Sequence, residues 1–276
     1  MWRGGALGAL AAGLVVPTGP VAAAGLDVQA LSLDHVATER DRSGALLNED
    51  SGPLSGVSLR VDRPEGGWWG QWTGLRGEVR YLGRSQIGLP VVTVSALDWQ
   101  EFALGLQQRS APKPAADGAW PGSMAADAGL ALVKRRIRRD IAPSPFSTRL
   151  TETLDWWGLR LRVRAHWQWD ERWRLELEGW GERSVRTRLA ADFHGVASNA
   201  TVKPGAAGGQ GRAVALSWCP SPRWRVSLTG HDSRQRYGES PAVPFVQNGQ
   251  VAGSASYPGS VQRSRGLGLG LSVDWP

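Results

Sequence analysis

The sequence has 276 residues, a single cysteine, 15 tryptophans and a formal net charge of +7. One cysteine cannot build an intramolecular disulfide framework, and no stretch beyond the N-terminus approaches the ~20 consecutive apolar residues of a membrane-spanning helix. The basic residues alternate with apolar ones and do not form runs, which argues against nucleic acid as a partner.

The N-terminus has the organisation of a secretory signal peptide. Arg3 precedes an apolar run over residues 6–16, and residues 22–24 form a small-residue A-x-A cleavage site. A positive start, a short apolar run and such a site are typical of exported proteins. We therefore predict a signal peptide over residues 1–24 and a single exported domain over residues 25–276.

The first part of the exported domain alternates apolar and polar residues, the pattern of a strand with one apolar face. Between Leu26 and Arg40 the parity changes, which predicts a β-bulge near Ala30. Residues 57–62 and 75–81 predict the next strands, with Leu75, Val79 and Tyr81 facing outward. Phe102, Leu104 and Leu106 mark the outer face of a fourth strand, and residues 130–140 predict a fifth with Lys134, Arg136 and Arg138 on one face.

The clearest element is a hairpin over residues 159–181, LRLRVRAHWQWDERWRLELEGWG. Its arms alternate strictly, and a short charged turn joins them. If Trp169 lies across from Trp173, the polar face pairs opposite charges: His166 with Glu176, Arg164 with Glu178 and Arg160 with Glu182. Cross-strand pairs of this kind contribute roughly 0.2 to 1 kcal/mol each.

Beyond the hairpin, residues 183–210 and 232–260 are predicted as long loops. Residues 212–219 and 224–229 form two strands around a short turn, and residues 267–275 form the last strand. The count is about ten strands. Short turns flanked by tryptophan alternate with long loops, which is the asymmetry of outer-membrane barrels. The predicted fold is all-β, a transmembrane antiparallel up-and-down β-barrel.

This combination of features resembles a small Gram-negative outer-membrane β-barrel, similar in size to the omptin class. The last strand, GLGLGLSVDW, resembles the C-terminal signal that such barrels present to the outer-membrane assembly machinery, although Pro276 follows Trp275 here. Residues 39–56 resemble the first surface loop of proteobacterial barrels of unassigned activity. The resemblance implies lipopolysaccharide and other outer-membrane lipids as partners, and location in the outer membrane.

A barrel of about ten strands has an interior that side chains can nearly fill. The residues predicted to line it have mixed sign, which favours an ion-paired plug over a pore, with a narrow anion-selective pore as an alternative. They are Arg60, Arg76, Glu78, Arg80, Glu101, Lys134, Arg136, Arg138, Glu152, Arg160, Arg162, Arg164, Glu176 and Glu178.

A surface hydrolase is the other alternative. An omptin-like protease would use acids and a histidine on the rim, where the candidates are Glu39, Asp41, Asp155, Glu182, His231 and Asp232. His231 and Asp232 are adjacent, so in a strand they point to opposite faces. A lipid A-modifying hydrolase or acyltransferase would need a serine, a histidine and an acid close together, for which His194 and Ser198 are candidates.

These residues match no catalytic motif, so no catalytic residue is assigned. His35 and His166 are predicted as strand residues, and the histidines show no metal-ligand spacing. No metal or cofactor is predicted. The sequence predicts an integral outer-membrane protein with a structural or surface-interaction role, with a soluble exported β-sandwich as the alternative fold.

Overall fold

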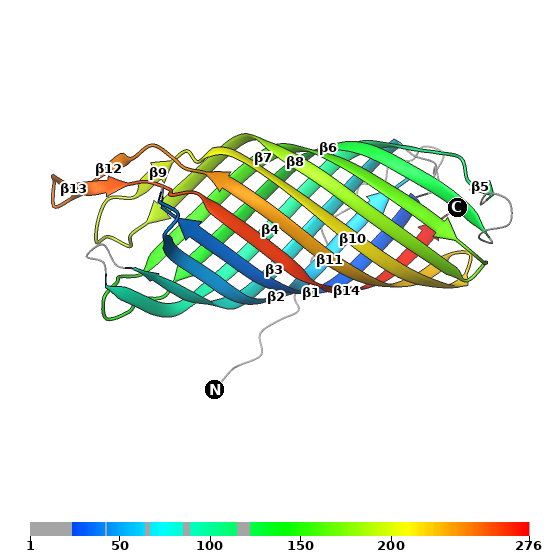
Figure 1. The fold of residues 1–276 in the computed structure, drawn as a ribbon, viewed down its shortest axis with the longest axis horizontal. Coiled ribbons are helices and arrows are strands. Elements are labelled where there is room, and N and C mark those ends of the chain that lie inside the picture. The colour runs from blue at the N-terminus through cyan, green and yellow to red at the C-terminus, as the bar shows by residue number, and fades with distance from the viewer. Residues whose placement is uncertain (1–23, 42, 64–66, 85–88, 115–121, 276) are drawn as a thin grey trace.

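The computed structural model describes residues 24–41, 43–63, 67–84, 89–114 and 122–275. Ten long antiparallel strands close into a barrel whose strands are strongly tilted (Figure 1). They are β1 (Ala24–Arg40), β2 (Leu46–Asp62), β3 (Gly67–Arg84), β4 (Pro90–Arg109), β6 (Ser123–Ile141), β7 (Leu150–Gln168), β8 (Trp173–Asp192), β10 (Gly205–Ser221), β11 (Trp224–Gly238) and β14 (Ser260–Trp275).

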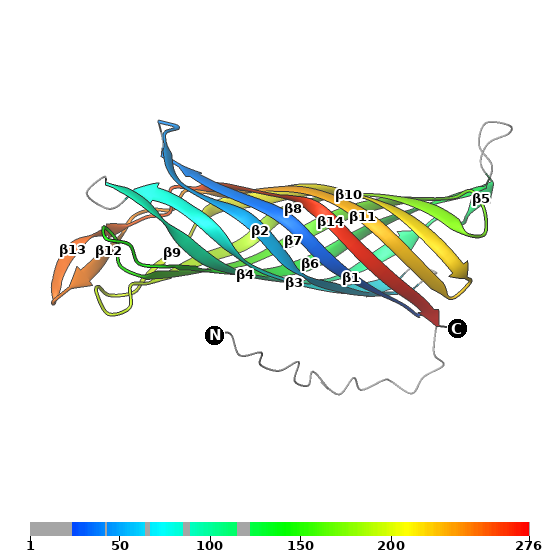
Figure 2. The ribbon, with the colours of Figure 1, turned by 90° about the horizontal axis from the view of Figure 1, so that it is seen from below.

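Short strands lie at the two ends of the barrel. They are β5 (Lys113–Pro114), β9 (Ala200–Val202), β12 (Val243–Gln247) and β13 (Gln250–Ala255). The β12–β13 hairpin projects from the end opposite to the C-terminus (Figure 2). The predicted signal peptide lies outside the described residues except for its last residue, Ala24, which begins β1.

Each long strand pairs with its neighbours in sequence, and β1 pairs with β14 to close the sheet. Closure matters because lipid offers no hydrogen bonds to a free sheet edge. The predicted all-β, up-and-down barrel of about ten strands is therefore confirmed. No helix in the described part of the chain is long and apolar enough to cross a membrane.

The outer surface of the barrel carries an apolar band. Leu267, Leu269 and Leu271 alternate along β14 and are each about half exposed or more, whereas Gly268 and Gly270 face the lumen. The same alternation places these large side chains outside: Val57, Leu59, Phe102, Leu104, Leu106, Leu130, Leu132, Leu159, Leu161, Val163, Leu177, Val214, Leu216 and Leu228.

The central hairpin pairs as predicted. In the β7–β8 register His166 lies opposite Glu176, Arg164 opposite Glu178 and Arg160 opposite Glu182. The rings of Trp169 and Trp173 stack with their centroids 6.5 Å apart at the short turn. The polar face of this hairpin therefore points into the lumen, as the alternation predicts.

The bulge predicted near Ala30 is wrong. The registers of β1 with β14 and with β2 continue through Ala30, and the irregularity in β1 is at Glu39/Arg40. Leu31 is buried inside the barrel and Leu33 packs against the same cluster. The change of parity in the sequence arises because apolar residues face outward near the short turns and inward nearer the long loops.

Near the long loops, apolar residues face inward instead of outward, so the faces predicted for two strands are wrong. On β3, Leu75, Val79 and Tyr81 face the lumen, and Arg76, Glu78 and Arg80 are exposed on the outside. On β6, Lys134, Arg136 and Arg138 are exposed, while the residues between them point inward. These six charged residues are therefore not lumen residues, because both strands extend beyond the apolar band and their outer face becomes polar there.

The predicted long loops are shorter than expected. β8 extends to Asp192 and β10 begins at Gly205, so much of residues 183–210 is strand. Likewise β11 extends to Gly238 and β14 begins at Ser260. The outer faces of these extensions carry arginines instead of apolar residues. The alternation that predicts a strand is therefore absent there.

Candidate functional site

The centre of the lumen is crossed by a ring of four charged side chains, which we call the central ring: Arg135, Arg160, Glu101 and Glu182. Arg135 contacts Glu101 at 2.5 Å and Glu182 at 2.8 Å. Arg160 contacts each of the same carboxylates at 2.7 Å. Since all four residues are buried and the charges balance, the ring avoids the cost of an unpaired buried ion.

Tryptophan rings fill the space around the central ring. The Arg135 guanidinium lies over Trp99 and Trp156, at 5.1 and 4.8 Å from the ring centroids. Arg160 lies over Trp180 at 4.6 Å. Such contacts attract a cation to the face of the ring, so aromatic and ionic side chains together obstruct the middle of the lumen.

A second cluster lies nearer the long loops and is centred on Arg139. Its guanidinium contacts Asp50 at 2.5 Å and Glu39 at 3.2 Å, and it also pairs with Glu152. The Asn48 amide donates a hydrogen bond to Glu39 at 2.6 Å. One cation therefore holds three carboxylates, and this cluster is acidic.

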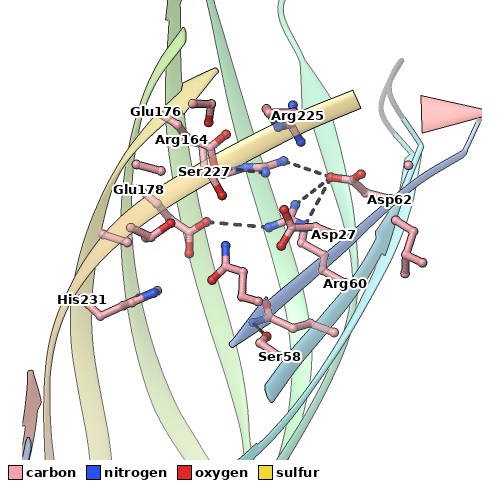
Figure 3. A pocket seen from close by; sticks show the side chains of 18 of the residues that line it. Asp27, Ser58, Arg60, Asp62, Arg164, Glu176, Glu178, Arg225, Ser227 and His231 are labelled. Carbon is pink, nitrogen blue, oxygen red and sulfur yellow. Dashed lines mark hydrogen bonds and ion pairs between the residues drawn. The ribbon is translucent and has the colours of Figure 1, made fainter. Parts of the chain in front are cut away.

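A third cluster lies nearer the short turns and encloses a cavity of about 110 Å³ (Figure 3). Arg60 contacts Asp62 at 3.0 Å and Glu178 at 3.7 Å, and Arg164 contacts Asp62 at 3.5 Å. His231 lines the same cavity. A polar space of this size holds a few water molecules, and mixed charges surround it.

The candidate rim acids are dispersed. Glu182 belongs to the central ring and Glu39 to the Arg139 cluster. Asp155 lies on the outer face of β7, in register with Arg136 and Arg188. His231 lines the lumen, whereas Asp232 faces outward and contacts Arg265 at 3.0 Å. Adjacent residues on opposite faces do not form a dyad.

Asp41 lies in the loop between β1 and β2, where it has a structural role. The Ser43 hydroxyl and the backbone N–H of Ala45 donate hydrogen bonds to its carboxylate at 2.5 and 2.9 Å. These hydrogen bonds, the Ser43 hydroxyl foremost, lower the pKa of the Asp41 carboxyl. The same carboxylate therefore caps the loop.

The candidate residues for a serine hydrolase, His194 and Ser198, have different hydrogen-bond partners. His194 Nε2 lies 2.9 Å from the Thr151 hydroxyl, whereas the Ser198 hydroxyl accepts a hydrogen bond from the backbone N–H of Val246. His35 is a buried strand residue beside the Ser264 hydroxyl at 3.0 Å. His166 contacts Asp127 and Glu176 inside the lumen.

In the described part of the chain, no three potential ligands from His, Cys, Asp and Glu gather as a metal site. The sequence pattern did not point to several charged lumen residues, among them Asp50 and Asp62 and, on β6, Arg135 and Arg139. The parity of Arg135 and Arg139 is opposite to that of Leu130 and Leu132, which face outward. Continuing this parity through residues 134–139 would have placed both arginines inside.

A closed antiparallel barrel with an apolar outer band and a charged lumen has the fold of outer-membrane β-barrel proteins. The outer membrane protease OmpT from Escherichia coli is similar in structure, with a TM-score of 0.57 and 11% identity; the match covers 92% of this chain and 97% of OmpT. At this identity the likeness shows the fold alone.

Other barrels are less similar, and nothing about this chain is inferred from them. Neisserial surface protein A matches with a TM-score of 0.34 at 12% identity, covering 91% of this chain and 97% of that one. The translocator domain of the autotransporter NalP from Neisseria meningitidis gives 0.35 at 12%, covering 90% and 88%. No family model and no curated protein sequence matches this chain.

Proposed function

We propose that this protein is an integral outer-membrane protein with a closed lumen, which has a structural or surface-interaction role in the cell envelope. The central ring supports this proposal most directly. Its guanidinium and carboxylate groups, surrounded by Trp99, Trp156 and Trp180, cross the barrel where a pore would have to be open.

The apolar band and the predicted signal peptide support the proposed location. We propose that the short turns face the periplasm and the long connections, including the β12–β13 hairpin, face the outside, because outer-membrane barrels have this asymmetry. The assembly machinery would recognise β14, whose outer face is formed by alternating leucines.

Fractionation of native cells tests the location. The protein should be in the outer-membrane fraction and should migrate faster on electrophoresis when it is not boiled, because a folded barrel stays compact in detergent. Recovery as a soluble periplasmic protein without a heat-dependent shift would refute the proposal.

Conductance tests the closed lumen. The purified barrel in a planar bilayer should leave the current at the level of the lipid alone. A steady ohmic current carried by anions would contradict the closed lumen and support the narrow pore. The folded barrel without conductance would support the structural or surface-interaction role.

A further inference from the structure

A cleft lies on the outside of the barrel, between β8, β10, β11 and β14. It has a volume of about 480 Å³ and is lined by Gly179 of β8, Gln210 and Arg212 of β10, Asp232 and Arg234 of β11, and Arg263 of β14. We call it the basic cleft. A Cβ added to Gly179, or to its outward neighbour Gly181, would meet no atom within 4 Å, so the glycines leave the β8 side open.

The charges of the basic cleft are not balanced. Asp232 contacts Arg212 at 3.1 Å, Arg265 at 3.0 Å and Arg263 at 3.6 Å, so one carboxylate gathers three guanidinium groups. Arg234 adds a fourth, and it lies directly opposite Arg263 in the β11–β14 register. Like charges in this position are destabilising, and an anion between them would relieve the repulsion.

The arginines keep hydrogen-bond donors available. The side chains of Arg212, Arg263 and Arg265 are 76%, 52% and 55% exposed. The planar guanidinium matches the oxygens of a phosphate and binds them in a bidentate manner. Phosphate is therefore the anion that suits this arrangement.

The basic cleft lies directly beyond the apolar band. On the outer faces of their strands, Val214 follows Arg212, Leu267 follows Arg265, and Leu228 precedes Gly230 and Asp232. All three apolar side chains are exposed. A ligand with a charged head and acyl chains would place its head among the arginines and its chains along β10, β11 and β14.

Around the basic cleft the positive charge extends to one border only. β8 contributes the exposed Arg183, Arg186 and Arg188, whereas at the other border β1 presents Asp34 opposite Arg265. β3 and β6 also carry exposed arginines. The cleft differs because three guanidinium groups share one carboxylate there and Arg234 lies directly opposite Arg263.

We propose that the basic cleft binds a phosphate group of a phosphorylated glycolipid in the outer leaflet, whose acyl chains lie along the apolar band of β10, β11 and β14. This inference rests on the proposed function, since it requires the long-loop end of the barrel to face the outside. The glycolipid would neutralise the arginines that Asp232 leaves in excess.

The test uses the full exported chain, refolded in detergent and shown to be heat-modifiable, with diphosphoryl lipid A as the probe. Native mass spectrometry measures the bound fraction. Arg212→Ala/Arg234→Ala/Arg263→Ala should bind about tenfold more weakly, because several charge-assisted contacts are lost. The control, Arg76→Ala/Arg80→Ala/Arg84→Ala, removes as many exposed cations from β3 and should stay within about twofold of the wild type.

The nature of the ligand is tested with two further probes. Lipid A stripped of its phosphates should bind the wild type about tenfold more weakly, because the arginines then have no anion to contact. Inorganic phosphate alone should not displace lipid A at equal concentration, because it has no acyl chains. Equal binding of the phosphate-free lipid, or displacement by inorganic phosphate, would overturn the proposal.

Equal losses in the cleft variant and the control would also overturn it, because they would indicate unspecific attraction between charges. Arg234→Gln, which affects no contact of Asp232, provides a milder variant and should weaken binding about threefold. Failure of the proposed function would appear separately, as a chain that is absent from the outer membrane or is not heat-modifiable.

Discussion

Arg135 and Arg136 are neighbours on β6 with opposite surroundings. Arg135 is buried in the lumen, between two carboxylates and two tryptophan rings. Arg136 is exposed on the outer surface. In the central ring each guanidinium is matched by carboxylates, because an unpaired charge there is costly. Outside, water or lipid can supply the counterion, so positive charge can accumulate.

The largest expected effect on stability comes from replacing Arg135, the buried residue of these two. Arg135→Met leaves Glu101 and Glu182 sharing Arg160 alone and should lower the free energy of unfolding by about 3 to 5 kcal/mol. Arg136→Met, the adjacent control, should change it by less than about 0.5 kcal/mol. Urea unfolding in micelles, followed by tryptophan fluorescence, measures both.

A second substitution sharpens that result. Adding Glu182→Gln to Arg135→Met leaves Arg160 with Glu101 as a one-to-one pair and should recover part of the lost stability. Equal stability of Arg135→Met and Arg136→Met would show that the central ring does not stabilise the fold.

The next effect compares the apolar band with the wall beyond it. Leu269→Arg puts a charge on the lipid-facing surface and should cost roughly 2 to 4 kcal/mol if the site is near the midplane. Val92→Arg, at an equally exposed apolar residue of β4 near the long loops, should fold and insert normally. Refolding yield into vesicles distinguishes the two variants, and equal yields would place the band elsewhere.

The smallest effect concerns an ion pair on the outer surface. Arg76 contacts Asp98 at 2.8 Å, with the Arg76 side chain 77% exposed. A double-mutant cycle with Arg76→Ala and Asp98→Ala should give a coupling energy of about 1 kcal/mol or less, and salt should reduce it further. A coupling as large as that of the central ring would contradict the contrast between the inner and outer surfaces.

Much of the barrel could be predicted from sequence because the lipid requires apolar residues at every second position. The β7–β8 hairpin and β14 follow this rule through most of their length, and their faces were predicted correctly. Beyond the band the rule fails. Leu75 and Val79 point inward there, since they pack in the lumen core, and an arginine is acceptable on either face.

The functional residues were predictable to the same limited extent. The charges of β7 followed from the hairpin register, whereas Arg135 and Arg139 lie in the strand segment KRRIRRD, in which both parities contain cations. Alternation alone cannot separate the faces of such a segment. The basic cleft depends on β10, β11 and β14 lying side by side, and strands predicted in isolation do not give this arrangement.

The strands are longer than a bilayer is thick, so part of the barrel extends beyond the membrane. The barrel strands have 15 to 20 residues, whereas about 9 to 11 tilted residues cross a bilayer. At ~3.3 Å per residue and a tilt of ~40°, the strand residues beyond the bilayer-crossing length extend the barrel wall by roughly 20 Å. In the orientation proposed above, the barrel would hold the β12–β13 hairpin above the headgroups, where a bulky extracellular protein could contact it without touching the lipid.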